Sequence, residues 1–237
     1  IEYMHISELF KQAPHPSSVS DYYHCFNSSN ILNVIYWWEY FQKTSGVDGD
    51  IVECGVGRGR SLITLMSINS LMTNIKTDYS KKIYALDSFQ GFPDPSEKDI
   101  SSRNAKKSEW SESPNQQFKY SPKSLKKVIE LADLDDEVEI VKGFFDKTTV
   151  SLSVDKIAIL HLDGDLYESL LAPLNNLWHK ISIGGIVVVD DYVSDEQFKV
   201  NEAFPGARKA ITEFMKMNDC FEYLVSIRGT PYLKRVK

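Results

Sequence analysis

Two stretches of the chain end in carboxylates at matched places. Residues 157–165 read IAILHLDGD, and residues 185–191 read GIVVVDD. Each is an apolar, β-branched run of strand length that stops at aspartate, and runs that are apolar on both faces suit central strands of a parallel sheet. Asp163, Asp190 and Asp191 would then meet at one edge of that sheet, where ligands bind in open α/β folds. Clustered carboxylates repel one another unless a cation lies between them, so we expect these three residues to bind a hard divalent cation such as Mg²⁺.

A glycine-rich turn further upstream predicts a second ligand-binding feature. Gly55, Gly57 and Gly59 follow a strand and precede a helix with the spacing G-x-G-x-G, which is not the G-x-G-x-x-G pattern of dinucleotide binders. Glycines let the backbone turn tightly and approach a ligand closely. Glu53 ends the strand just before the turn, where a carboxylate repels a pyrophosphate but suits a ligand with a cationic or hydroxylated part.

The second strand points to the same kind of ligand. Asp87 follows residues 82–86 and could accept hydrogen bonds from ribose hydroxyls. S-adenosylmethionine carries a ribose, an adenine and a sulfonium but no phosphate, so it is the cofactor that these acids favour. Ser88, beside Asp87, and Ser61, at the helix start, could contact this cofactor or only cap local backbone.

Five motifs occur along the chain in a fixed order. They are ECGVGRG at 53–59, LDSFQGFP at 86–93, KGFFDKT at 142–148, LDGDLYES at 162–169 and DDY at 190–192. Together they resemble the macrocin O-methyltransferase (TylF/MycF-like) family over about residues 30–236. The resemblance implies an S-adenosylmethionine- and Mg²⁺-dependent O-methyltransferase (EC 2.1.1 class) that acts on a sugar hydroxyl of a small-molecule glycosylated or natural-product acceptor. The family usually has an aromatic residue where this chain has Gly57, and often arginine where it has His161.

The resemblance also suggests residue roles, each with an alternative. It implies that Asp165, the second aspartate of Asp-Gly-Asp, is the general base, although Asp165 could instead cap the helix that follows. His161 is the competing base because imidazole titrates near neutrality, but it could be a buried histidine of the core or one behind the metal ligands. Gly143 and Phe144 are expected to bind the cofactor, with Phe144 packed on adenine. Phe144 could instead be a core residue.

Alternating strands and helices must position these residues. The pattern predicts strands at 50–54, 82–86, 138–141, 156–162 and 185–190, helices at 30–42, 60–72, 122–132, 167–180 and 205–217, and a hairpin at 221–227 and 231–236. This is a doubly wound α/β fold, a Rossmann-like class I methyltransferase sheet that is mostly parallel with one antiparallel strand near the C-terminus.

The domain plan has three parts. Residues 1–30 form an N-terminal extension and residues 31–237 the methyltransferase domain. Within it, the polar segment 93–121 is an insertion that we expect to be a lid over the acceptor, or else a surface loop.

Composition limits the remaining function classes. A net charge of −6 and a pI near 5.4 argue against a nucleic-acid partner, and no apolar run approaches the roughly 18 residues of a membrane helix. Three widely spaced cysteines and a start unlike a signal peptide favour a cytoplasmic protein, and a homo-oligomer is compatible with the sequence. Two other classes stay open: a glycosyltransferase with Asp163-Gly-Asp165 as an Asp-x-Asp motif, and a non-catalytic S-adenosylmethionine or sugar binder.

Overall fold

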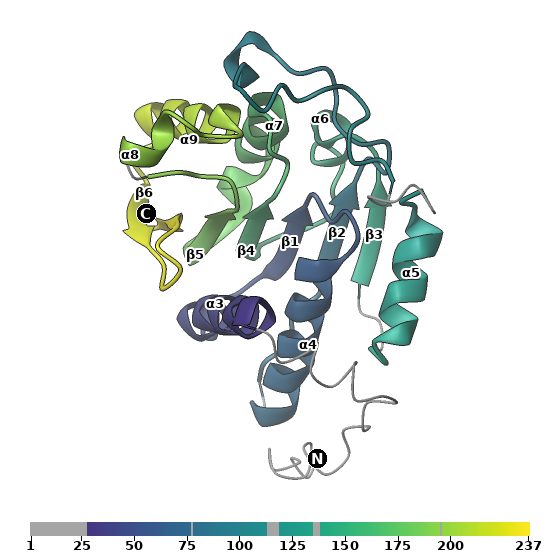
Figure 1. Cartoon of the computed structure of the whole chain (residues 1–237). Coiled ribbons are helices and arrows are strands. Elements are labelled where there is room, and N and C mark those ends of the chain that lie inside the picture. The colour runs from purple at the N-terminus through teal and green to yellow at the C-terminus, as the bar shows by residue number, and fades with distance from the viewer. Residues whose placement is uncertain (1–27, 77, 113–118, 135–137, 195) are drawn as a thin grey trace.

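The computed structural model of the chain describes residues 28–76, 78–112, 119–134, 138–194 and 196–237 (Figure 1). The predicted N-terminal extension therefore lies outside the described residues, except that residues 28–30 belong to the first helix. Residues 113–118 of the predicted insertion lie outside them as well.

Seven strands of the described chain form one sheet in the order β3-β2-β1-β4-β5-β7-β6. Their bounds are β1 Asp50–Cys54, β2 Ile83–Asp87, β3 Val138–Lys142, β4 Ile157–Leu162, β5 Ile181–Val189, β6 Phe221–Val225 and β7 Pro231–Arg235. The first five strands of this order pair in parallel, and β7 runs antiparallel to both of its neighbours. The predicted fold class is confirmed, because β7 is the one strand of the described sheet that opposes the rest.

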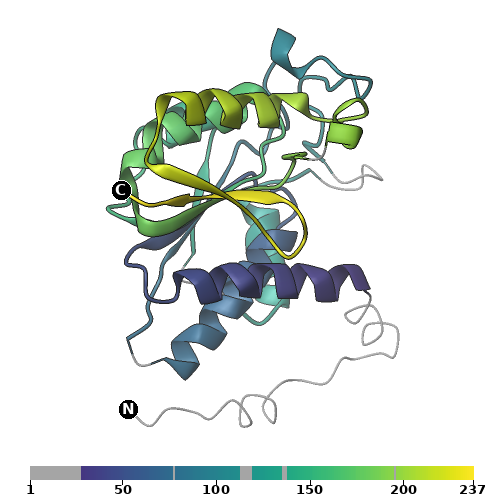
Figure 2. The ribbon, with the colours of Figure 1, turned by 90° about the vertical axis from the view of Figure 1, so that its left-hand side faces the viewer.

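Helices cover both faces of the sheet (Figure 2). The longer ones are α3 Ser28–Thr44, α4 Arg60–Ile75, α5 Pro122–Leu131, α7 Tyr167–Leu177 and α9 Pro205–Met217. Short helical turns are η1 Glu97–Asp99, α6 Phe145–Thr148, η2 Trp178–Lys180 and α8 Glu196–Lys199. Apolar residues of α3, α4 and α5 pack in one core layer, and those of α7 and α9 pack in the other. Strand β4 is buried along its whole length between the two layers, which explains its continuous apolar sequence.

Local signals account for several helix boundaries. Helix α5 has Pro122 in its first turn, and Ser121 and Ser124 form a reciprocal capping box at its start. Helix α9 likewise begins with a proline, Pro205. No helix of the described residues combines the length and the apolar character needed to cross a membrane.

Strand β5 differs most from its predicted bounds. It begins at Ile181 instead of residue 185, because the chain stays in the sheet through two glycines. Gly184 has φ of +86°, and the pairing of β5 with β4 shifts register between Ile157 and Ile159. A bulge of this kind lets a strand continue where glycines in the sequence indicate a turn.

The strand order reverses direction beside β1, and the loops that follow β1 and β4 meet there. The N–H of Asp163 donates to the carbonyl of Cys54 at 2.8 Å, and the N–H of Asp190 donates to the carbonyl of Leu162 at 3.1 Å. Gly55 has φ of +101°, and a Cβ at this position would lie 1.8 Å from the Asp163 carbonyl oxygen. Glycine is therefore required where the first loop crosses the end of β4.

The described part of the insertion is fastened to helices α7 and α9. The buried Asp99 carboxylate accepts hydrogen bonds from the N–H of Tyr167 at 2.7 Å and from the N–H of Ser96 at 2.8 Å. Lys98 bonds to Glu213 of α9 at 2.8 Å. Asp99 thus satisfies the first N–H group of α7, which its N-cap residue Leu166 leaves without a side-chain cap.

Replacing Gly206 with alanine is expected to destabilise this junction. A Cβ on residue 206 would lie 1.9 Å from Asp99 Oδ1 and 2.6 Å from the Tyr167 nitrogen, and neither can move without losing the helix cap. Overpacking of this kind typically costs about 1–3 kcal/mol of unfolding free energy, which urea denaturation would measure. Gly46→Ala is the matched control, because its Cβ would meet no atom within 4 Å. Equal stabilities of the two variants would contradict this view of the junction.

Candidate active site

One large cavity opens at the carboxyl ends of the central strands. Its volume is about 1100 Å³. This exceeds the roughly 300–1,000 Å³ of pockets that hold one drug-sized ligand, so two small molecules have room in it. Its wall is formed by α3, the glycine turn after β1, the segments that follow β2 to β5, the insertion, and Arg228 of the β6–β7 turn.

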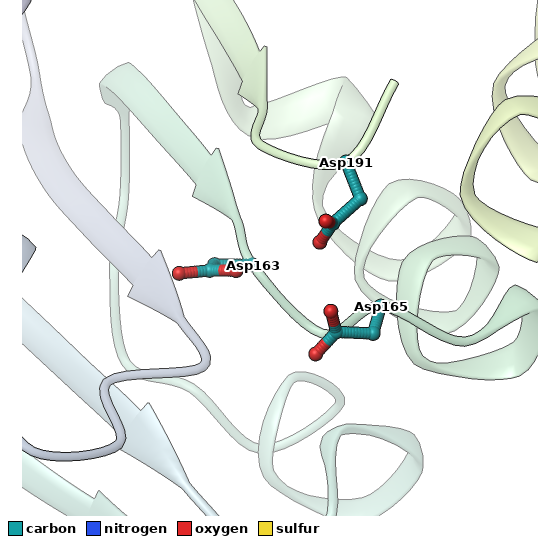
Figure 3. A group of neighbouring side chains, drawn as sticks. All are labelled: Asp163, Asp165 and Asp191. Atoms are coloured by element: carbon teal, nitrogen blue, oxygen red, sulfur yellow. The ribbon is translucent and has the colours of Figure 1, made fainter. Parts of the chain in front are cut away.

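Three aspartates form an acidic group on the cavity wall (Figure 3). One carboxylate oxygen from each of Asp163, Asp165 and Asp191 lies within 4.8 Å of the others. Asp163 follows β4 and Asp191 follows β5, and these two strands are neighbours in the sheet. Asp165 reaches the group because its backbone adopts φ of +58°, a conformation that non-glycine residues seldom take.

Burial and mutual repulsion raise the pKa values of this group, and a cation bound among the carboxylates would oppose that rise. Burial raises the pKa of Asp163 well above its usual value, and the charge of Asp190 raises it further. Burial also raises the pKa of Asp165, as does the charge of Asp191. For Asp191 burial again raises the pKa, while a side-chain hydrogen bond with Asp165 opposes the shift. Three converging oxygen donors with these shifts are a donor set that suits a hard divalent cation.

Asp190 has a different partner. Its Oδ1 accepts a hydrogen bond from Nη1 of Arg228 at 2.8 Å, across the turn that joins β6 and β7. The Arg228 guanidinium also lies 5.3 Å from the ring centroid of Tyr36 in α3. The structure therefore places Asp190 beside the acidic group with one oxygen engaged, and brings Asp165 into the group in addition to Asp163 and Asp191.

Glu53 and His161 form a buried pair behind the cavity wall. Their side chains are 0% and 1% exposed, and Glu53 Oε1 lies 3.1 Å from His161 Nδ1. Burial lowers the pKa of His161, but the hydrogen bond and the charge of Glu53 outweigh it, so the net direction is upward. Trp37 packs edge-on against the His161 imidazole, with the two ring centroids 4.7 Å apart. Neither Glu53 nor His161 is among the residues that line the cavity.

The glycine turn and Asp87 line the cavity at the ends of β1 and β2. Asp87 Oδ2 accepts from the N–H of Gly57 at 2.8 Å, and Oδ1 accepts from the N–H of Phe89 at 2.6 Å. Burial raises the pKa of Asp87, while these backbone hydrogen bonds lower it. A Cβ on Gly57 would meet no protein atom within 4 Å, so the glycine leaves space at the wall for a ligand.

Most of the predicted site residues meet at this cavity. Those on its wall are Gly55, Gly57, Ser61, Asp87, Ser88, Phe144, Asp163, Asp165, Asp190 and Asp191. Gly59 and Gly143 lie off the wall, and each has a packing role. A Cβ on Gly59 would lie 2.8 Å from Leu125 Cδ1 of α5, and one on Gly143 would lie 2.8 Å from Thr148 Cγ2.

The sequence did not indicate several wall residues. They include Asn33 and Tyr36 of α3, Glu168 of α7, and Arg228. Arg228 lies within the predicted hairpin, but nothing in the sequence connects that turn with Asp190. The cap role that we considered for Asp165 goes to Asp99, which bonds to the start of α7 from the insertion.

Comparison with known proteins gives one consistent family. Residues 41–230 match the model of a family described as Macrocin-O-methyltransferase (TylF). Demethyldecarbamoylnovobiocin O-methyltransferase of Streptomyces niveus is 31% identical over 195 residues, which cover 81% of this chain and 68% of that protein. An 8-demethyl-8-(2,3-dimethoxy-alpha-L-rhamnosyl)-tetracenomycin-C 4'-O-methyltransferase of Streptomyces olivaceus is 32% identical over 63% of this chain, which spans 55% of that protein.

A solved structure agrees with the sequence relatives. The structure of the O-methyltransferase NovP superimposes with a TM-score of 0.65 and 28% identity, covering 84% of this chain and 79% of that chain. The chain therefore has a fold similar to that of a solved O-methyltransferase.

Proposed function

The chain belongs to the macrocin O-methyltransferase (TylF) family, and from this membership we propose that it methylates a sugar hydroxyl of a natural-product glycoside. It is accordingly an O-methyltransferase and not a glycosyltransferase. One observation carries the proposal: one cavity is lined both by the glycine turn with Asp87 and by the acidic group. A cofactor and an acceptor can therefore lie side by side.

The acceptor class is supported by the names of the relatives. By their names, the Streptomyces olivaceus relative methylates the 4' position of a rhamnosyl-bearing tetracenomycin, and the Streptomyces niveus relative methylates demethyldecarbamoylnovobiocin. We extend the sugar-bearing acceptor class to this chain. The cavity volume and its mixed polar and aromatic wall favour such a molecule.

The acidic group fits a divalent cation such as Mg²⁺. Asp163 and Asp191 belong both to the ligands predicted from the sequence and to the group that the structure brings together. Asp190 is our proposed third ligand, since its Oδ1 alone is engaged by Arg228. A cation held there would lower the pKa of the acceptor hydroxyl and fix the orientation of that hydroxyl.

Asp165 is our proposed general base. Its carboxylate lies on the cavity wall within the acidic group, where an acceptor hydroxyl bound in the cavity can reach it. One Asp165 carboxylate oxygen takes the hydroxyl proton as the acceptor oxygen becomes a nucleophile. S-adenosylmethionine, when bound, supplies the methyl group: a carbon–oxygen bond forms, the carbon–sulfur bond breaks, and sulfur keeps the electron pair. The remaining wall residues position both molecules and exclude water.

The fit for S-adenosylmethionine depends on Asp87 and the open space at Gly57. Asp87 already accepts two backbone hydrogen bonds, and an ionised carboxylate has about four acceptor positions, so it can still accept from ribose hydroxyls. Ser61, Ser88 and Phe144 share this part of the wall. We keep them as proposed cofactor contacts.

Asp87→Ala is expected to weaken S-adenosylmethionine binding by about 1.5–3 kcal/mol, the range for losing a hydrogen bond to a charged group. The change also frees the N–H of Gly57, so it loosens the glycine turn. Calorimetric titration with S-adenosylmethionine would measure the loss. Asp94→Ala is the control, because Asp94 lies on the same wall but is an exposed residue paired with Lys107. Unchanged affinity of a folded Asp87→Ala variant would remove Asp87 from the cofactor site.

A methyl-transfer assay tests the function as a whole. The enzyme would be supplied with S-adenosylmethionine labelled in its methyl group, with Mg²⁺, and with a panel of glycosides that includes demethyldecarbamoylnovobiocin and p-nitrophenyl glycosides of several sugars. The labelled methyl group should enter a sugar hydroxyl of at least one glycoside. It should not enter any aglycone that is supplied without its sugar. Labelling of aglycones only would refute the proposed acceptor class.

A further inference from the structure

Trp110 is an aromatic residue of the insertion that faces the cavity. It is 53% exposed and lies on the wall together with Glu109 and Phe92. Ile100 of the same insertion is 75% exposed but lies away from the wall. The exposed indole of Trp110 is therefore a surface inside the site, and the proposed methyl transfer does not yet use it.

The backbone around Trp110 is fixed and strained. The N–H of Phe92 donates to the Glu109 carbonyl at 3.0 Å, and the N–H of Ser108 donates to the Phe92 carbonyl at 2.9 Å. These two hydrogen bonds join the two ends of the loop formed by residues 93–107. Trp110 has φ of +62° and Ser108 has φ of +63°, a region that bulky side chains rarely adopt. Strain of this kind persists where the surroundings impose it, and it concentrates at ligand sites.

The Trp110 indole contacts two phenylalanine rings and one arginine. Its ring lies 5.2 Å from that of Phe92 and 5.8 Å from that of Phe204, which belongs to the segment before α9. The Arg103 guanidinium lies 5.6 Å from the Trp110 ring and pairs with Glu109 at 2.6 Å. These contacts hold the orientation of the indole before any ligand arrives, which reduces the entropy lost on binding.

The aromatic support reaches the proposed base. Phe92 and Phe204 form a buried cluster with Leu166, and Leu166 directly follows Asp165. Trp110 and Asp165 therefore line the same cavity and are connected through one buried aromatic cluster. The part of an acceptor that must lie beside Asp165 is the ring that carries the reacting hydroxyl.

We infer that Trp110 is the platform on which the acceptor's sugar ring stacks. This inference rests on the proposed function and names a residue that positions the acceptor. The C–H bonds on one face of a pyranose carry slight positive charge, and the face of an indole is negative, so the two attract while the ring hydroxyls stay free for the acidic group. The cofactor is expected elsewhere, with its adenine at Phe144 and its ribose at Asp87.

Kinetics of Trp110→Ala and Trp110→Phe with two glycosides of one sugar test the inference. The sugar would be the one that turns over best in the panel, supplied once as its methyl glycoside and once as its p-nitrophenyl glycoside. Trp110→Ala should raise KM by roughly 3- to 10-fold for both glycosides, the range expected for one lost aromatic contact. Trp110→Phe should restore much of the loss, since it keeps an aromatic face. Both variants should keep the wild-type kcat within a few-fold and the wild-type affinity for S-adenosylmethionine.

Ile100→Ala, a substitution in the same insertion off the wall, should leave KM unchanged. Thermal unfolding would show that each variant is folded. A KM increase seen only with the p-nitrophenyl glycoside would mean that Trp110 contacts the aglycone, and a normal KM in Trp110→Ala would mean that it contacts neither; both overturn the inference while the proposed function stands. If the wild-type enzyme methylates no glycoside, the proposed function fails and this inference fails with it.

Discussion

Asp165→Asn is expected to reduce the rate of methyl transfer by roughly 10²–10⁴-fold, the usual cost of losing a general base. The amide keeps the size of the side chain but cannot take a proton from the acceptor hydroxyl. Affinity for S-adenosylmethionine should stay close to that of the wild type, because Asp165 follows β4, whereas the proposed ribose acid Asp87 ends β2. Single-turnover measurements at saturating cofactor and acceptor would isolate the chemical step.

Two comparisons make this result specific. Glu168→Gln is the matched control, since Glu168 is an exposed carboxylate on the same cavity wall and should tolerate the change. His161→Ala tests the competing base; the imidazole is buried against Glu53 and off the wall, so its loss should lower stability more than the rate of the chemical step. If high Mg²⁺ concentrations restore Asp165→Asn to normal rates, Asp165 is a metal ligand and not the base.

Removal of the metal is expected to abolish turnover. EDTA should stop methyl transfer and added Mg²⁺ should restore it, because the acidic group is the proposed site of the cation that lowers the pKa of the acceptor hydroxyl. Asp191→Ala or Asp190→Ala should remove the response to Mg²⁺ while binding of S-adenosylmethionine largely survives. Calorimetric titration with Mg²⁺ would measure metal binding directly, without dependence on activity.

A third variant separates the roles of neighbouring aspartates. Arg228→Ala leaves the Asp190 carboxylate without its guanidinium partner. If Asp190 is a ligand, this variant should still bind Mg²⁺, since one competing positive charge has been removed. Full activity of the wild-type enzyme in EDTA would refute the metal assignment altogether.

Most strands and helices could be predicted from the sequence, because the residues that begin and end them are close together in the chain. The bounds predicted for β1 and α9 agree with the structure, since one is an apolar run before a glycine turn and the other starts at a proline. Strand β5 was predicted too short, because Gly184 and Gly185 indicate a turn in sequence but form a bulge in the sheet.

The sequence also determined which residues end the central strands. Asp87 is the last residue of β2, Asp163 directly follows β4, and Asp191 lies just after β5. Parallel strands place their carboxyl ends at one edge of the sheet, so these three residues meet there. That rule is enough to bring the glycine turn and the aspartates to a common cavity. It does not fix which side chains face the cavity and which turn into the core.

Only the tertiary structure decided those contacts. It buried Glu53 against His161, 108 residues away, and paired Asp190 with Arg228, 38 residues away. It also bonded Asp99 to Tyr167, 68 residues away, and so fixed the start of α7 beside Asp165. The physical reason is that hydrophobic periodicity and strand ends are encoded locally, whereas partners between distant loops depend on strand order and on how the insertion and the final hairpin pack against the sheet.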